Sequence, residues 1–132
     1  MQKPNPTSGL HHVALFAKNF EACTYFYTEL LGMHIVWQPD ADNLYLSSGN
    51  DNLALHRAPE GFTPAPHQHL DHIGFFLQQR EDVDQWHQFL CAQQVTIKAV
   101  PKDHRDGTRS FYCADPDDNV VQLIYIPTIA SA

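Results

Sequence analysis

Two histidines at matching positions are the chemically informative feature of this 132-residue sequence, which contains 9 histidines in all. His12 is the third residue of an apolar run at 10–16, and His72 is the third residue of a similar run at 70–76. Imidazole is the commonest ligand of transition metals and the usual acid or base near neutral pH. The matching positions therefore indicate one shared site, provided that the fold brings the two runs together.

Each run is followed by residues with helical spacing, which points to an internal repeat. In the first copy the apolar helix face is expected at Ala22, Phe26 and Leu30. Asn19 is expected as the N-cap of this helix, and Gly32 as the residue that ends it. The corresponding residues of the second copy are Val83, Trp86 and Leu90, after Glu81 and Asp82 in the first turn. Because the two copies agree in kind and in order, we interpret them as a true repeat.

Three short runs with strand composition follow each predicted helix. They are residues 34–38, 43–47 and 53–57 in the first copy, and residues 95–100, 109–114 and 120–126 in the second. The sequence therefore predicts an α+β fold of two βαβββ modules, with a mixed, curved sheet that forms a cup. We expect a single domain over 1–132, with module one at about 9–58, a linker at 59–69 and module two at about 70–127.

Alternation along the strands predicts which side chains share a face of the sheet. In the first strand the wholly apolar set suits the helix side, which leaves His12 on the opposite, concave face. The same reasoning places His72 and Gln122 on the concave face of the second module. A shift of one residue would present His11 instead, but the period-two pattern favours His12.

Four segments carry a resemblance to a known family. They are His12-Val-Ala-Leu, the helix end FYTELLGM at 26–33, Asp71-His72-Ile-Gly, and the run RSFYCADPDDNVVQL at 109–123. Together they resemble the vicinal-oxygen-chelate superfamily, which includes glyoxalase I, fosfomycin thiol transferases, extradiol dioxygenases and bleomycin-resistance proteins. The resemblance spans about residues 10–126 and implies the βαβββ modules, but superfamily members differ in their chemistry.

The resemblance also implies a metal site, since metal-using members take ligands from the first and last strand of each module. Carried onto this sequence, those positions are His12, Leu55, His72 and Gln122. A leucine cannot bind metal, and Gln122 offers a neutral amide oxygen where relatives of the two-histidine type have a glutamate. The implied cofactor is therefore a divalent metal ion, Zn, Mn, Ni or Fe(II), held by His12, His72 and Gln122.

Three more residues are candidates for catalytic roles in and before the predicted strand at 109–114. Arg109 is expected to bind an anion and His104 to act as an acid or base, in a loop that could close over a substrate. An ordinary hairpin loop is the competing interpretation for His104. Tyr112 is expected to point into the cup, with aromatic core packing as the alternative.

These residues favour two functions of different classes. The first is a metal-assisted enzyme for a small molecule with vicinal oxygens, of the lyase, isomerase, dioxygenase or thiol-transferase type. The second is a metal-free protein that binds and sequesters a hydrophobic or aromatic small molecule, like the bleomycin-resistance proteins. The absence of a carboxylate at Leu55 and Gln122 favours the second.

Composition and sequence patterns limit the partners and the location of the protein. The net charge of −7, with only 8 Lys and Arg residues, argues against binding to nucleic acid or to an anionic membrane surface. No apolar run approaches the roughly 20 residues that span a bilayer. Three cysteines without a pairing motif and the lack of a secretory signal at the N-terminus predict a cytoplasmic protein. The resemblance implies a homodimer that completes the cup across a two-fold axis. Two arrangements stay open: His12, His72 and Gln122 meet within one chain, or His12 of one chain faces His72 and Gln122 of the other.

Overall fold

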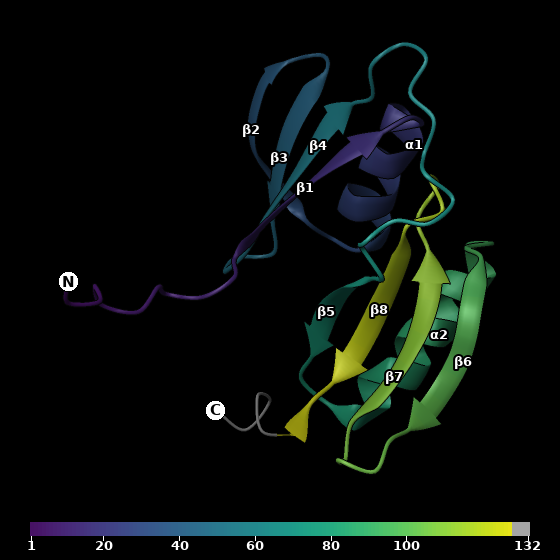
Figure 1. The fold of residues 1–132 in the computed structure, drawn as a ribbon. Helices are drawn as coiled ribbons and strands as arrows, with labels where there is room; N and C mark the ends of the chain where they lie inside the picture. Colours follow the sequence, from purple (N-terminus) through teal and green to yellow (C-terminus); the bar gives the residue numbers. More distant parts are fainter. Residues whose placement is uncertain (128–132) are drawn as a thin grey trace. The chain divides into compact units, whose positions relative to one another are not determined.

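The computed structural model describes residues 1–127, which fall into two compact units that divide between Glu60 and Gly61. Each unit runs strand, helix, and then three strands (Figure 1). The predicted α+β fold of two βαβββ modules is therefore confirmed. Among residues 1–127, no helix is both long enough and apolar enough to cross a membrane.

The first unit is a four-stranded mixed sheet with one helical segment. Its elements are β1 (His12–Ala17), α1 (Phe20–Tyr25), the π-helical turn η1 (Phe26–Leu30), β2 (His34–Asp40), β3 (Asn43–Ser47) and β4 (Asn52–Arg57). The strand order is β1-β4-β3-β2, with β1 parallel to β4 and the other pairs antiparallel.

The second unit repeats this topology. Its elements are β5 (Ile73–Leu77), α2 (Arg80–Ala92), β6 (Ile97–Asp103), β7 (Arg109–Ala114) and β8 (Val120–Tyr125). The strand order is β5-β8-β7-β6, again with the first and last strands parallel. In both units, therefore, the first strand of the module lies beside its last strand.

The edge strands run further than the sequence predicted. β2 extends to Asp40 and β6 to Asp103, whereas the predicted runs stopped at 38 and 100, just before a proline. Proline has no backbone N–H to donate to a neighbouring strand. An inner strand is paired on both sides, whereas an edge strand is paired on one side only and therefore tolerates a proline. β2 and β6 are both edge strands.

The helix of the first unit buries a different face from the predicted one. Phe20, Cys23 and Phe26 are buried, whereas Ala22 is exposed and Leu30 is only half-buried. The prediction for Ala22 and Leu30 was wrong. Ala22 lies in the α-helical segment but off its buried face, which runs through Phe20 and Cys23. Leu30 lies in the π-helical last turn, whose side chains do not keep the α-helical spacing.

The ends of this helix lie where the sequence placed them. Asn19 occupies the N-cap position. Gly32 follows the last turn with φ of 80°, the left-handed conformation that favours glycine. Its N–H donates to the carbonyl of Thr28 at 3.1 Å, and the N–H of Met33 donates to the carbonyl of Tyr27 at 3.0 Å.

The second helix matches its predicted face more closely. Val83 and Leu90 are fully buried and Trp86 is half-buried. The carboxylate of Asp82, in the first turn, accepts a hydrogen bond from the N–H of Gln79 at 3.1 Å. This contact satisfies one of the backbone donors that a helix N-terminus exposes.

Strand pairing corrects the repeat alignment at β4. Ala14 pairs with Ala54, and the equivalent pair in the second unit is Gly74 with Gln122. The counterpart of Gln122 is therefore Ala54, and the predicted match to Leu55 was wrong by one residue. The connection at 48–51 is one residue shorter than the one at 115–119. An alignment of the two modules that ignores this difference assigns every residue of β4 to the wrong face of the sheet.

Leu55 is consequently predicted to act as a core residue. It is 1% exposed and pairs with Leu44, which is also buried. We expect Leu55→Ala to lower the free energy of unfolding by about 2–5 kcal/mol, measured by chemical denaturation. Leu10→Ala, at a side chain that is 90% exposed, is the control and should change it by less than about 0.5 kcal/mol. Equal effects of the two changes would contradict the assignment.

Candidate functional site

One face of the second sheet collects the polar candidates of that unit. Gln122 in β8 lies between Gly74 of β5 and Tyr112 of β7, its pairing partners on either side. Paired residues of neighbouring strands share a face, so these three positions lie on the same side of the sheet. We call this side the open face of the second unit, opposite the side that packs against α2.

Gln122 is held in place on this face by its neighbours. Its side-chain Nε2 donates a hydrogen bond to the hydroxyl oxygen of Tyr112 at 3.0 Å. A Cβ atom at Gly74 would lie 3.3 Å from Oε1 of Gln122, so the glycine leaves room for the amide. With Nε2 bound to Tyr112, the amide presents Oε1 as its acceptor atom.

His72 completes this group within the second unit. Its ring meets the ring of Tyr112 edge-on, with centroids 5.3 Å apart and an interplanar angle of 81°. Its Nδ1 donates to the carboxylate of Asp71 at 2.7 Å. With the proton on Nδ1, the other ring nitrogen, Nε2, carries a lone pair, which is the form in which histidine binds metals.

His12 has the same internal arrangement in the first unit. Its Nδ1 donates to the side-chain oxygen of Asn52 at 2.7 Å, which again leaves Nε2 with the lone pair. Asn52 pairs with His12 across β1 and β4 and therefore anchors it from the neighbouring strand. The structure thus gathers His72, Tyr112 and Gln122 in one unit and anchors His12 on the sheet of the other.

His104 lies in the hairpin between β6 and β7. Its Nε2 is 3.0 Å from the hydroxyl oxygen of Ser110, and its backbone N–H donates to the carbonyl of Thr108 at 2.9 Å. Ser110 is two residues from Tyr112 on the same strand and therefore lies on the open face. The histidine is exposed, so it stands at one end of this face, held by a buried serine.

Arg109 lies on the opposite face of the sheet. It is an odd number of residues from Tyr112 in β7, and its guanidinium reaches α2, where Nε and Nη2 contact the Asp84 carboxylate at 3.0 and 2.8 Å. Nη1 contacts the carboxylate of Asp103 at 3.1 Å. Hydrogen bonding to this cation lowers the pKa of both carboxyl groups. Arg109 is therefore a structural ion-pair partner of Asp84 and Asp103, and it lies on the opposite side of the sheet from Gln122.

The sequence interpretation missed one histidine of the first unit. His56 was not among the candidates, yet it belongs to β4 and shares a face with His12 and Phe16. Its ring meets Tyr45 edge-on at 5.8 Å, and Tyr45 stacks against Trp37 at 5.0 Å. Strand parity could have found it, because His56 is four residues from Asn52 on the same strand.

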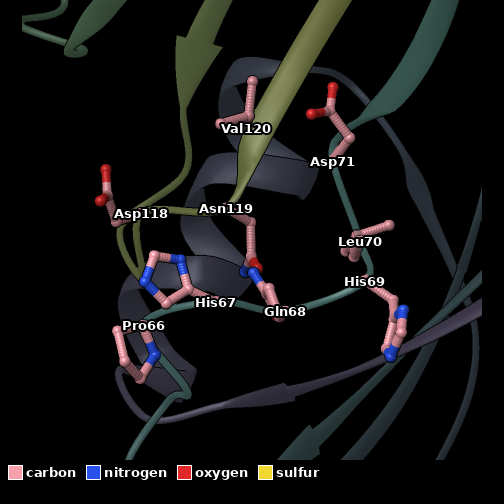
Figure 2. Close-up of a pocket in the computed structure, with 9 residues that line it drawn as sticks. All are labelled: Pro66, His67, Gln68, His69, Leu70, Asp71, Asp118, Asn119 and Val120. Carbon is pink, nitrogen blue, oxygen red and sulfur yellow. The ribbon is translucent and has the colours of Figure 1, made fainter.

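A pocket of about 320 Å³ lies where the segment before β5 meets the turn between β7 and β8 (Figure 2). It is lined by Pro66, His67, Gln68, His69, Leu70, Asp71, Asp118, Asn119 and Val120. Figure 2 shows His67 and His69 on opposite sides of the pocket. The carboxylate of Asp118 pairs with Lys98 at 2.8 Å, and Asp71 supports His72, so both acidic groups already have partners.

Within residues 1–127, no three His, Cys, Asp or Glu side chains are grouped as a metal site would require. Two histidines and one glutamine fall outside this definition, since glutamine is not one of those four residue types. Imidazole nitrogen is a good ligand for a divalent ion, and the neutral amide of Gln122 is a weaker donor than a carboxylate.

Comparison with known proteins identifies the family. Residues 9–123 match the model of the glyoxalase/bleomycin resistance protein/dioxygenase superfamily. The chain belongs to this superfamily. It is 26% identical over 117 residues to the metallothiol transferase FosB of Staphylococcus epidermidis, a match that covers 88% of this chain and 80% of that protein.

Solved structures show the same fold. A lactoylglutathione lyase from Agrobacterium tumefaciens matches with a TM-score of 0.74 and 21% identity, over 92% of this chain and 96% of that one. A glyoxalase-related enzyme from Fulvimarina pelagi matches with a TM-score of 0.75 and 17% identity, over 92% and 90% of the two chains. At these identities the likeness concerns the fold, and the chemistry must be argued from this chain's own residues.

The Arg109 contacts lead to a pH-dependent prediction. A lowered carboxyl pKa in the folded state stabilises the fold above the ordinary aspartate pKa of 3.8, and this contribution is lost as pH falls through the lowered value. We expect Arg109→Met to lower the free energy of unfolding at pH 7 by roughly 0.5–1 kcal/mol, the value of a partly exposed pair.

The difference between wild type and Arg109→Met should shrink below pH 4, as followed by urea denaturation across the acid range. Arg105→Met, at an exposed position of the β6–β7 hairpin, is the control and should track the wild type at every pH. A difference that stays constant down to pH 2 would show that Arg109 acts through packing and not through these carboxylates.

Proposed function

We propose that this protein binds a divalent metal ion through Nε2 of His12, Nε2 of His72 and Oε1 of Gln122, which come from one chain or from two copies of it, and acts on a small molecule with two adjacent oxygens. This proposal is supported by the similar hydrogen bonds that hold the two histidines. Each has Nδ1 bound to an oxygen acceptor, Asn52 for His12 and Asp71 for His72. This arrangement orients a ring and presents Nε2 for coordination.

The residues around the donors have separate tasks. Tyr112 accepts the hydrogen bond of the Gln122 amide and so orients its oxygen. Gly74 keeps the space beside that oxygen clear. His104, at the end of the same face, is the candidate for holding or moving a proton, because histidine is the side chain that most often serves as a general acid or base. When bound, the ion would polarise the substrate oxygens and stabilise the negative charge that develops on them.

The three donors are neutral, which distinguishes this site from one with a carboxylate. Gln122 leaves the charge of the ion uncompensated by the ligands, so affinity for the ion is lower and attraction for an electron-rich oxygen ligand is higher. Ala54, the structural counterpart of Gln122 in the first unit, adds no fourth donor.

A metal-free binding protein is the second candidate function. The chemistry at Gln122 and Ala54 favours it, since neither position carries a carboxylate. The aromatic side chains of Trp37, Tyr45 and His56, on the face of the first sheet that carries His12, would then bind an apolar or aromatic molecule directly.

Metal binding separates the two candidates. We expect the protein to bind one equivalent of Zn, Mn, Ni or Fe(II) per site, and Gln122→Glu to tighten binding on the order of tenfold, the gain from ~1.4 kcal/mol of added attraction. His12→Ala and His72→Ala should each abolish binding in calorimetric titration. His67→Ala, in the pocket of Figure 2, is the control and should leave the affinity unchanged.

Substoichiometric binding of all four ions by the wild type, with no gain in Gln122→Glu, would overturn the metal proposal. It would leave the metal-free binding protein as the supported function.

We also propose that the protein acts as a homodimer in the cytoplasm. The two-module chain supports a dimer because superfamily cups are often completed by a second copy. Cys23, Cys91 and Cys113 form no disulfide within residues 1–127, which suits a reducing compartment. Light scattering at micromolar concentration should give about twice the chain mass of 15.0 kDa, and a mass near 15.0 kDa would contradict the dimer.

A further inference from the structure

Helix α2 carries the only exposed cysteine among residues 1–127, and a histidine lies within reach of it. Cys91 is exposed, whereas Cys23 and Cys113 are buried. The Sγ atom of Cys91 lies 3.5 Å from Nε2 of His87. Residues four apart on a helix are neighbours on the same face. An exposed sulfur and an imidazole nitrogen are therefore side by side on one face of α2.

The distance between these two atoms is the one that a tetrahedral metal ion requires. Zinc in proteins is tetrahedral, with bonds of about 2.3 Å to cysteine sulfur and about 2.05 Å to histidine nitrogen. A tetrahedral angle between two such bonds puts the sulfur and the nitrogen about 3.5 Å apart. The observed separation is also 3.5 Å, so an ion can replace the proton between the two atoms while the helix keeps its geometry.

The ring of His87 is held by the sheet beneath the helix. It meets the ring of Phe111 edge-on, with centroids 5.3 Å apart and an interplanar angle of 71°. Phe111 is fully buried in β7, so this contact restrains the imidazole from a fixed part of the core. A side chain that is already restrained loses less freedom when it binds a ligand.

The position of Cys91 in the last turn of α2 also favours a bound cation. The helix ends at Ala92 and has no basic side chain in this turn. The carbonyl groups at a helix C-terminus carry partial negative charge, which stabilises a nearby cation and disfavours an unpaired thiolate. A metal ion satisfies both conditions, since cysteine binds it as a thiolate and the ion supplies the positive charge.

The pair offers two protein ligands and leaves the rest of the coordination shell open. Asp84 lies one turn before His87, but its two carboxylate oxygens contact Arg109 at 2.8 and 3.0 Å. Among residues 1–127, no third His, Cys, Asp or Glu side chain joins the pair. Because Cys91 is exposed, water can take the other two positions of a tetrahedral ion.

From the matching distance, the restrained imidazole and the uncompensated helix end, we propose that Cys91 and His87 form a binding site for a thiophilic divalent metal ion such as zinc. Thiolate sulfur selects such ions over magnesium and calcium, which prefer oxygen ligands. On binding, the ion displaces the thiol proton, which passes to solvent. The site lies on the helix side of the second sheet, opposite the face of Gln122, and it does not depend on the proposed function.

Absorption spectroscopy with cobalt(II) tests the site, because cobalt bound to a thiolate gives a charge-transfer band in the near ultraviolet. His12, His72 and Gln122 offer no sulfur, so an ion held by them gives no such band. We expect the reduced full chain to develop the band, and His12→Ala to develop it equally, with saturation at one cobalt per chain. Zinc should remove the band, since it binds such donors more tightly than cobalt does.

Matched variants locate the binding. Cys91→Ser should abolish the band, and His87→Ala should weaken cobalt binding at least about tenfold, since two linked ligands bind far more tightly than one. Gln85→Ala, at an exposed position of the same helix, is the control and should leave the titration unchanged. Circular dichroism checks that each variant keeps the fold.

Protection of the thiol is a second measurement that needs no variant of Cys91. We expect this exposed thiol to react quickly with an aromatic disulfide reagent, and the buried Cys23 and Cys113 to react slowly. A zinc concentration that just saturates the wild type should slow the fast reaction at least about tenfold, because metal-bound sulfur is a poorer nucleophile. The same concentration should slow it much less in His87→Ala.

Three results would overturn the proposal. The first is the absence of the near-ultraviolet band at high cobalt concentration, and the second is a band that survives in Cys91→Ser. The third is the same cobalt titration in His87→Ala and the wild type, which would show that the imidazole is not a ligand. Calorimetric titrations of the His12 and His72 variants are made in the Cys91→Ser background, so that each metal proposal can fail without affecting the other.

Discussion

The parallel pairing of the first and last strand of each module is the constraint on which the candidate site depends. It sets Gly74 beside Gln122, and Ala14 beside Ala54. A parallel pair needs a long crossover connection, and here the helix and the two other strands of the module supply it. The helix covers one face of the sheet, so the polar residues of the first and last strands gather on the other face.

This division of faces separates structural from chemical tasks. In β7, Arg109 and Phe111 face α2, where the arginine is neutralised by carboxylates and the phenylalanine is fully buried. Tyr112, the next residue, faces the other way and orients Gln122. Adjacent residues of one strand thus serve the core and the candidate site in turn. Any substitution that shifts the register of β7 would exchange these tasks.

The two modules keep the same topology and have diverged on their open faces. The second carries hydrogen-bonding groups, with Tyr112 and Gln122 in contact beside His72. The first carries His12 among aromatic rings, with Ala54 where the second has Gln122. The buried faces have changed less in kind, because both must pack against a helix. Divergence is tolerated most where side chains do not contribute to the core.

Much of this architecture could be predicted from the sequence alone. Hydrophobic periodicity and the repeated order of elements indicated two βαβββ modules, because period two and helical spacing each require a particular element. They also placed His12, His72 and Gln122 on the faces away from the helices. Glu81 and Asp82 correctly marked the start of the second helix.

What only the tertiary structure decided depends on pairing between strands and on contacts distant in sequence. The register showed that Ala54 and not Leu55 corresponds to Gln122, since one residue in a turn changes the face of a whole strand. The bulge that turns Trp37 towards Tyr45 is likewise a property of two paired strands. The sequence does not indicate a partner for Arg109, and only folding brings Asp84, 25 residues away, to its guanidinium.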